Sequence, residues 1–477
     1  MKKHFIPLVL IVSIIAFIPS SIFAQKWMKV SAGGRFSAAL RSDGTIWECG
    51  RAAQGQLGNG ADTTQVYNFA QTGTDTDWVD ISCGEDHILA LKRNGSLWAW
   101  GNNGNGELGV GDSISRKYPE QINSDFDWVY ISASSYASYA IKKDGSIWGW
   151  GLNFDGNLGD SNRVNQAVPV KIDGTYKWRK ICAGKPFSMA LRADGTLWAS
   201  GFNGDGDLGN GTLKNSLVLV QVNTDNDWID ISSGWNFTIA LKKNGTIWSW
   251  GYNGNGQLGQ GNISPLSKPK MISSDSDWVR ISTGCLYGYG IKRNGTLWAW
   301  GSNYIGELGD GTTNQYDFPK MIGSENDWRM VSGAKGYSIS SNVLRGLFSL
   351  GIRGDSSTLC VTGENDYGQL GIGSFMNIHQ YDCDIYAGIP DIKTSINDHI
   401  RIFPNPANET VNISIPVNNQ IEGRICISDM NGKQVYFNNI MLTNNLMPID
   451  ISALPQGVYL LEIFSKDQVF RTKLVKE

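Results

Sequence analysis

Paired aspartates are the residues whose types and spacing come nearest to a metal-ligand set. Asp75 and Asp77 lie just before a tryptophan, and the pair recurs as Asp125/Asp127, Asp225/Asp227 and Asp275/Asp277. Paired carboxylates can bind Ca²⁺, but aspartate also caps turns by hydrogen bonding to nearby backbone. Lys177 replaces the second aspartate in one copy, which favours capping over a required metal, and Asp205 and Asp207 are interpreted in the same way. We expect the pairs to form an acidic rim, and we expect no metal and no cofactor.

Histidine and nucleophile chemistry is sparse. His87, His379 and His399 are the histidines beyond the N-terminal segment. His87 falls at a mostly aromatic position, whose counterparts are Phe36, Ala137, Phe187, Phe237, Tyr287 and Tyr337, so we interpret it as a packing residue. No Ser/His/Asp arrangement or H-E-x-x-H motif can be assembled. The glycine-rich segments precede turns rather than helices, which argues against phosphate binding. We expect no catalytic residue.

The elements that must position any site come from an internal repeat. Markers of the same type recur every 50 residues: Trp78, Trp98, Leu108, Trp128, Trp148, Leu158, Trp178, Trp198, Leu208, Trp228, Trp248, Leu258, Trp278, Trp298, Leu308 and Trp328. The series begins earlier, one residue out of step, at Trp27, Trp47 and Leu57. A β-rich period of about 40–50 residues is typical of propeller blades.

One copy predicts four short strands. Residues 78–82 alternate apolar and polar side chains, and 88–92, 97–100 and 118–122 form further strand-like runs. Asn94-Gly95 predicts a tight hairpin turn, and this turn chemistry also accounts for the N-x-S/T sequences, so we assign no glycosylation. Four strands per repeat make one blade.

The repeat pattern, W-x-x-I-S-x-G followed by A-L-K-x-D/N-G-T-L-W-x-W-G-x-N and G-x-L-G-x-G, resembles the regulator of chromosome condensation repeat family from residue 26 to about 384, in seven copies. The resemblance implies an all-β, seven-bladed propeller. We expect residues 375–385 to share a blade with the N-terminal strand and close the ring. The seventh copy carries an insertion between Ser338 and Thr358, interpreted as a loosened closing blade, with a functional loop as the alternative.

Candidate binding residues lie where the copies differ most, around the loop that follows the first strand of each copy. By ring symmetry these positions gather on one face. The candidates are Arg35, Asp86, Tyr136, Trp235, Asn236, Tyr287 and Lys335. Trp235 is the only tryptophan outside the strand series, which suggests a binding anchor, with packing under the loop as the alternative. We expect Tyr136, Trp235 and Tyr287 to form an aromatic surface patch.

The chain ends predict export. Residues 1–24 carry Lys2 and Lys3, an apolar run and small residues up to Ala24, as in a cleaved signal peptide, and the run is too short to span a bilayer. The net charge of −3 offers no basic excess for nucleic acid. We assign residues 25–390 to the propeller, 391–399 to a linker and 400–477 to a small β-sandwich.

The tail carries its own signature. FPNPANETVNI, DMNGKQVY and IDISALPQGVYLLEI resemble the type A C-terminal sorting domain of the type IX secretion system, with a generic adhesive sandwich as the alternative. The resemblance implies a Bacteroidetes-type source, recognition by the secretion machinery, export across the outer membrane and removal of the tail on export.

The cysteines are spread unevenly. Cys49, Cys83, Cys182, Cys285 and Cys426 are interpreted as core residues, as are Cys360 and Cys383, for which a disulfide in an oxidising compartment is the alternative.

Together these features predict a secreted or cell-surface binding module, without enzymatic activity and without a transmembrane anchor, that presents its variable loops to an extracellular protein or glycan. The first alternative is an extracellular polysaccharide-acting enzyme, which needs two carboxylates roughly 5–10 Å apart. The second, implied by the family, is nucleotide exchange on a small GTPase, against which the predicted secretion argues.

Overall fold

The structure is a computed structural model that describes residues 26–60, 64–336, 338–340, 343–354, 357–383, 401–403, 405, 407–414, 421–429, 434–442, 447–465 and 469–476. The predicted signal peptide, residues 1–24, and the predicted linker, residues 391–399, lie outside these described residues. Every regular element within them is a β-strand. Within the same residues, no helix is long and apolar enough to cross a membrane.

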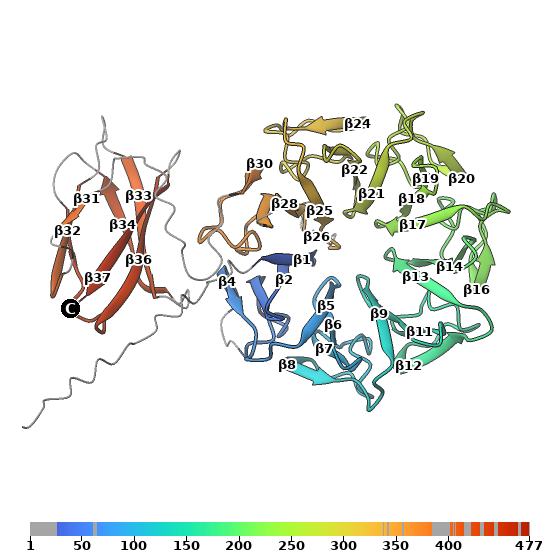
Figure 1. The fold of residues 1–477 in the computed structure, drawn as a ribbon, viewed down its shortest axis with the longest axis horizontal. Coiled ribbons are helices and arrows are strands. Elements are labelled where there is room, and N and C mark those ends of the chain that lie inside the picture. The colour runs from blue at the N-terminus through green and yellow to red at the C-terminus, as the bar shows by residue number, and fades with distance from the viewer. Residues whose placement is uncertain are drawn as a thin grey trace, which may run out of the picture.

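The described residues of the repeats form seven four-stranded antiparallel sheets, each built from strands that are consecutive apart from one inserted hairpin (Figure 1). Blade one contains β1 (Trp27–Ala32), β2 (Phe36–Arg41), β3 (Ile46–Arg51) and β4 (Gln65–Gln71); blade two contains β5 (Trp78–Cys83), β6 (His87–Lys92), β7 (Leu97–Gly101) and β8 (Arg116–Gln121). Blade three contains β9 (Trp128–Ala133), β10 (Ala137–Lys142), β11 (Ile147–Gly151) and β12 (Gln166–Asp173); blade four contains β13 (Trp178–Ala183), β14 (Phe187–Arg192), β15 (Leu197–Gly201) and β16 (Ser216–Gln221).

The remaining blades repeat this order. Blade five contains β17 (Trp228–Ser233), β18 (Phe237–Lys242), β19 (Ile247–Gly251) and β20 (Leu266–Met271); blade six contains β21 (Trp278–Thr283), β22 (Tyr287–Lys292), β23 (Leu297–Gly301) and β24 (Tyr316–Ile322). Blade seven contains β25 (Trp328–Gly333), β28 (Phe348–Arg353), β29 (Thr358–Gly363) and β30 (Ile378–Asp382). The seven-bladed propeller predicted from the repeat is therefore confirmed, and the blades follow one another around a common axis (Figure 1).

The repeat markers are constant because they pack between neighbouring blades. Leu97 and Leu108 of blade two share a core with Trp128 and Trp150 of blade three, and the same kind of shared core recurs around the ring. The predicted tight turn is present as well: Gly95 has φ 84°, a left-handed conformation that glycine adopts without steric cost. Local turn chemistry and the interblade core thus explain the 50-residue pattern.

The predicted mode of ring closure is wrong. Residues 378–382 form β30, which pairs with β29 of blade seven and not with the N-terminal strand. The ring closes instead by side-chain packing, in one core that combines Trp27 and Val30 of blade one with Phe348 and Leu350 of blade seven. Each blade keeps its own four strands because β1 already supplies the innermost strand of blade one.

The seventh copy differs from the others by an inserted hairpin, β26 (Ser338–Ser340) and β27 (Val343–Arg345). The register shows that Phe348, opposite Gly363, is the counterpart of His87, opposite Gly101. Tyr337, which the sequence placed at this aromatic position, lies outside the described residues. The insertion therefore begins earlier than predicted, directly after Ala334. A Cys360–Cys383 disulfide joins β29 to the residue after β30, while the other five cysteines are unpaired and buried.

The tail contains two sheets. One is formed by β31 (Arg401–Phe403), β32 (Thr410–Ser414) and β35 (Met447–Asp450), and the other by β33 (Ile421–Asp429), β34 (Gln434–Leu442), β36 (Gly457–Ser465) and β37 (Val469–Lys476). Val411 and Ile449 of the first sheet share a buried core with Ile425, Leu461 and Leu474 of the second. This is the small sandwich that the sequence predicts.

Candidate functional site

The loops between the first and second strands of the blades meet at one end of the propeller axis. The second residue of each such loop defines a surface that we call the central face. Its members are Gly34, Glu85, Ser135, Lys185, Trp235, Cys285 and Lys335. Backbone N–H groups link neighbouring loops, from Gly34 to the carbonyl of Glu85 (2.9 Å), and from Trp235 to the carbonyl of Cys285 (2.9 Å). The sequence differences between copies are thus concentrated on a backbone frame that is itself hydrogen bonded.

A charged and aromatic cluster occupies part of the central face. Lys185 Nζ lies 4.0 Å from Glu85 Oε2, 5.0 Å from the ring centre of Tyr136 and 5.6 Å from that of Trp235, within the range of cation–π attraction. Glu85 Oε2 is buried and accepts no hydrogen bond. Burial raises the pKa of Glu85, although Lys185 and a hydrogen bond from the Tyr136 side chain oppose this effect. A buried carboxylate oxygen without a donor is energetically unfavourable, so Glu85 would gain from a partner that moves the side chains covering it and donates to Oε2.

Lys335 brings the start of the seventh-blade insertion into the same face. Its Nζ donates to the carbonyl of Ser233 in blade five (3.2 Å), and its own carbonyl accepts from Ser135 Oγ of blade three (3.3 Å). Burial lowers the pKa of Lys335. Gly336 packs so closely on Gly34 that an added Cβ would lie 2.3 Å from the Gly34 Cα. The start of the insertion is therefore joined to the central face. This placement is a requirement of the alternative interpretation, in which the insertion is a functional loop.

The residues that follow the central-face positions contact the end of the third strand or the loop between the third and fourth strands. Asp86 accepts from Arg51 (3.1 Å) and from Gln56 (3.0 Å), and Asn236 donates to Asp205 (3.1 Å). The Arg35 guanidinium lies 5.4 Å from the ring centre of Tyr367. Arg35, Asp86 and Asn236 thus surround the central cluster rather than form its centre.

Trp235 is half-buried and packs against the core of blade six. Part of its indole therefore packs under the loop, and the rest is available as a binding anchor. The predicted patch of Tyr136, Trp235 and Tyr287 is wrong in one member. Tyr287 is 0% exposed and donates its hydroxyl to the Phe348 carbonyl (2.7 Å), because it occupies the aromatic packing position of its blade. Glu85 and Lys185 were not among the predicted site residues, and only their opposite charges at the same loop position could have indicated them.

The aspartate pairs form a different structure from the one predicted. In blade three, Lys142 Nζ lies 2.7 Å from Asp125 and 3.1 Å from Asp127, and 4.7 Å and 5.1 Å from the ring centres of Trp128 and Trp148. Lys92, Lys242 and Lys292 repeat this arrangement in blades two, five and six.

The capping interpretation needs correction, because the carboxylates bind lysine while Asn123 caps the turn through the Asp125 N–H (3.0 Å). The predicted acidic rim is partly neutralised by these lysines. No group of three or more potential metal ligands occurs among the described residues.

His87 is a packing residue, as predicted. It is buried, its Nε2 lies 2.9 Å from Ser138 Oγ, and burial lowers its pKa to about 3. The imidazole therefore stays neutral at physiological pH and is not placed for acid–base chemistry on a ligand.

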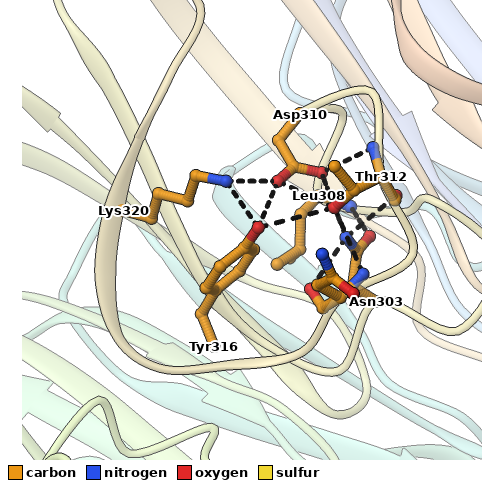
Figure 2. Close-up of polar contacts among 7 residues, drawn as sticks. Asn303, Leu308, Asp310, Thr312, Tyr316 and Lys320 are labelled. Carbon is orange, nitrogen blue, oxygen red and sulfur yellow. Dashed lines mark hydrogen bonds and ion pairs between the residues drawn. The ribbon is translucent and has the colours of Figure 1, made fainter.

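Carboxylates that could support polysaccharide hydrolysis serve the loops instead. Figure 2 shows Asp310, which accepts from Lys320 (2.7 Å), Tyr316 (2.8 Å) and Thr312 (2.8 Å). Burial opposes these hydrogen bonds, which nevertheless lower the pKa of Asp310 to about 2. Asn303 completes the loop by accepting the Leu308 N–H (3.0 Å), which explains why leucine recurs at that position. An ion-paired carboxylate of this kind stabilises the loop and is a poor general acid.

Burial raises the pKa of Asp207 to about 8, and it also raises the pKa of Glu107 and Glu307 at the same loop position. Asp207 Oδ2 accepts the Asp205 N–H (3.3 Å), as Glu107 does with the Asn105 N–H (2.8 Å). It therefore occupies a turn-supporting position that is shared with other blades.

These observations define a propeller that presents a variable, polar and aromatic face at one end of its axis. The model of the RCC1-like domain matches residues 15–285, more than half of the chain, and the regulator of chromosome condensation (RCC1) repeat model matches residues 294–340. The chain belongs to the RCC1-like domain family. The secretion system C-terminal sorting domain model matches residues 401–477, which indicates export through type IX secretion to the cell surface or the exterior.

Relatives and solved structures agree with this assignment. The chain is 35% identical over 97 residues to the ultraviolet-B receptor UVR8 of Arabidopsis thaliana, covering 20% of this chain and 22% of the relative. It is 31% identical over 96 residues to the human E3 ubiquitin-protein ligase HERC2, covering 20% of this chain and 2% of the relative. The chain thus aligns with less than a quarter of either relative.

Two solved structures share the fold. Prp20p from Saccharomyces cerevisiae has a TM-score of 0.63 and 19% identity, covering 80% of this chain and 90% of that chain. Human WBSCR16 has a TM-score of 0.59 and 21% identity, covering 65% of this chain and 85% of that chain. At these identities the likeness concerns the fold alone.

Proposed function

We propose that this protein is a secreted interaction module that binds an extracellular protein through its central face after export by type IX secretion. The family, whose propellers act mainly in binding, and the sorting domain support the general role. A glycan is the alternative ligand for the same face. The proposal assigns no catalytic step to the protein.

One observation carries the proposal: the buried Glu85 Oε2 has no hydrogen-bond donor and lies beside Lys185 and the half-buried Trp235. A partner that donates to Glu85 would satisfy this oxygen, and its apolar group would cover the indole. A buried aromatic anchor ringed by polar groups is typical of an interface hot spot. Trp235 and Glu85 would therefore contribute most of the binding energy.

Site-specific photocrosslinking tests the proposal. A photoreactive benzoylphenylalanine replaces Pro186, the residue next to Lys185 of the central face. A matched probe replaces Asn94 in a turn at the opposite end of the propeller. Both proteins are added to the cell surface and medium of the producing bacterium. The proposal predicts a discrete adduct from position 186 that is absent from position 94. An excess of unlabelled wild-type protein should suppress this adduct by competition, whereas an excess of Trp235→Ala should not. Identical adducts from both positions, or equal suppression by Trp235→Ala, would contradict it, and a carbohydrate adduct would favour the glycan.

A further inference from the structure

The rim of blade four differs from that of four other blades at the position of the repeat tryptophans. In blades two, three, five and six, a lysine ammonium fills the niche between the two repeat tryptophans and is held by the aspartate pair. Blade four has Thr175 and Lys177 in place of the aspartates, and Arg192 in place of the lysine. Blade four therefore lacks both the lysine and the aspartate pair that occupy this niche in the other four blades.

Arg192 lies at the edge of the niche, against Tyr176 and Trp198. Its guanidinium pairs with Asp194 (3.1 Å) and stacks on Tyr176, 3.6 Å from the ring centre, while it lies 5.4 Å from the centre of Trp198. The structure has a cavity of about 290 Å³ here. We call it the rim groove. The residues that line it include Asp160, Lys171, Asp173, Tyr176, Trp178 and Trp198.

The side chains of the rim groove specify a ligand. Tyr176 is 47% exposed and Trp198 is half-buried, so both offer aromatic surface. Asp173 accepts from the Trp178 indole N–H (2.8 Å) and from the backbone of Tyr176 (3.1 Å) and Thr175 (3.3 Å). The Thr175 hydroxyl also hydrogen bonds to Asp173. Because Thr175 is exposed, a ligand hydroxyl can take the place of its hydroxyl on the carboxylate. Lys171, which is exposed, supplies donors.

A strained residue marks the same groove. Ser161 of blade three has φ 69°, where each of the other six blades has a glycine of positive φ: Gly60, Gly111, Gly211, Gly261, Gly311 and Gly373. A non-glycine residue in this conformation costs of order 1–3 kcal/mol, and such residues concentrate at ligand sites. The serine places a hydroxyl on the groove wall, which glycine would not.

The charges around the groove decide between ligand classes. A cation is disfavoured because Lys171 lines the groove and the Arg192 guanidinium stacks on Tyr176 at its edge. A phosphate is disfavoured because Asp160 and Asp173 line it. A neutral ring with one apolar face and several hydroxyls satisfies both constraints, and the cavity lies near the lower end of the range of small-ligand pockets.

We propose that the rim groove binds a neutral saccharide, with the apolar face of a pyranose ring on Tyr176 and Trp198 and its hydroxyls on Asp173 and Lys171. This site is separate from the central face and does not depend on the function proposed for it. It would let the exported propeller bind a polysaccharide while the central face binds a protein.

Titration of the full-length protein with neutral oligosaccharides, namely cello-, xylo-, malto- and mannohexaose, tests the proposal by tryptophan fluorescence and calorimetry. The decisive variant rebuilds the lysine clamp of the other blades: Thr175→Asp, Lys177→Asp and Arg192→Lys combined. Its lysine should fill the niche, so saccharide affinity should fall at least about tenfold while the thermal unfolding midpoint is kept. Tyr176→Ala should have a similar effect on affinity.

Phe126→Ala is the matched control, because Phe126 holds the position of Tyr176 in blade three, where Lys142 fills the niche. It is 56% exposed, and its removal should leave saccharide binding unchanged. The proposal is overturned if none of the four saccharides binds at millimolar concentration. It is also overturned if a saccharide binds the rebuilt-clamp variant or Tyr176→Ala as tightly as it binds wild type.

Discussion

Glu48→Gln should stabilise the propeller, and more strongly as the pH rises. Glu48 lies in β3 and is 1% exposed. Its Oε1 accepts from the Trp100 indole N–H (3.2 Å), and its Oε2 contacts the Thr72 hydroxyl, which also lies 3.1 Å from the Leu57 carbonyl. One hydroxyl proton cannot serve both acceptors. A protonated carboxyl, or the amide of glutamine, can donate to Thr72 and free the hydroxyl to donate to Leu57.

Burial raises the pKa of Glu48 from 4.5 to about 8, although hydrogen bonds from Thr72 and Trp100 oppose the shift. Since the folded state favours the protonated form, ionisation costs stability as the pH rises from the unfolded pKa through the folded one. Each pKa unit corresponds to about 1.4 kcal/mol. The cost is about 1 kcal/mol at pH 5, about 3 kcal/mol at pH 7 and about 5 kcal/mol well above pH 8.

Urea unfolding followed by tryptophan fluorescence at pH 5, 7 and 9 measures this effect. The advantage of Glu48→Gln over wild type should grow across this series. Glu120→Gln is the control: its side chain is 44% exposed and pairs with Arg116, so it should change stability by less than about 1 kcal/mol. The reasoning fails if Glu48→Gln is no more stable than wild type at pH 9, or if its advantage is the same at all three pH values.

Three further predictions concern the frame of the propeller. Lys142→Met leaves two carboxylates without their cation, so the urea midpoint should fall by the equivalent of about 1–2 kcal/mol; an unchanged midpoint would contradict the clamp. Replacing Cys360 and Cys383 by serine should lower the free energy of unfolding by about 3 kcal/mol, as expected for a crosslink of this loop size, and so lower the melting temperature. Dithiothreitol should lower the melting temperature of wild type but not that of the double-serine variant. His87→Phe should lose less stability than wild type as the pH falls from 6.5 to 3, because the folded state lowers the pKa of His87 to about 3. An equal decrease of the unfolding free energy with falling pH in both proteins would refute this.

Much of the fold could be predicted because its determinants are local and repeated. The tryptophans and Leu108 recur at the interblade core, and the Asn94-Gly95 turn encodes its own hairpin. Ring closure could not be predicted, since residues 378–382 carry the pattern of any outer strand and nothing local specifies the partner. The insertion was misplaced because Tyr337 and Phe348 are both aromatic, and only the pairing of Phe348 with Gly363 identifies the packing position.

The candidate site was predictable as a set of loops but not as a set of contacts. Variation between copies indicated the loops, yet the approach of Lys185 to Glu85 spans 100 residues and depends on the curvature of the ring. Tyr287 was misassigned because exposure depends on which face of the strand its side chain occupies. The rim groove depends on absences in one blade, which became informative only once the lysine clamp of the other blades was visible.

The most direct test of the central claim is the affinity of the partner identified by crosslinking for three proteins: wild type, the double variant Lys185→Ala/Trp235→Ala, and Tyr176→Ala at the rim groove. An interaction module that binds through its central face should lose at least about tenfold in affinity in the double variant, equivalent to about 1.4 kcal/mol, and should be unaffected by Tyr176→Ala. Equal affinity of wild type and the double variant would contradict the assignment of the central face as the binding surface.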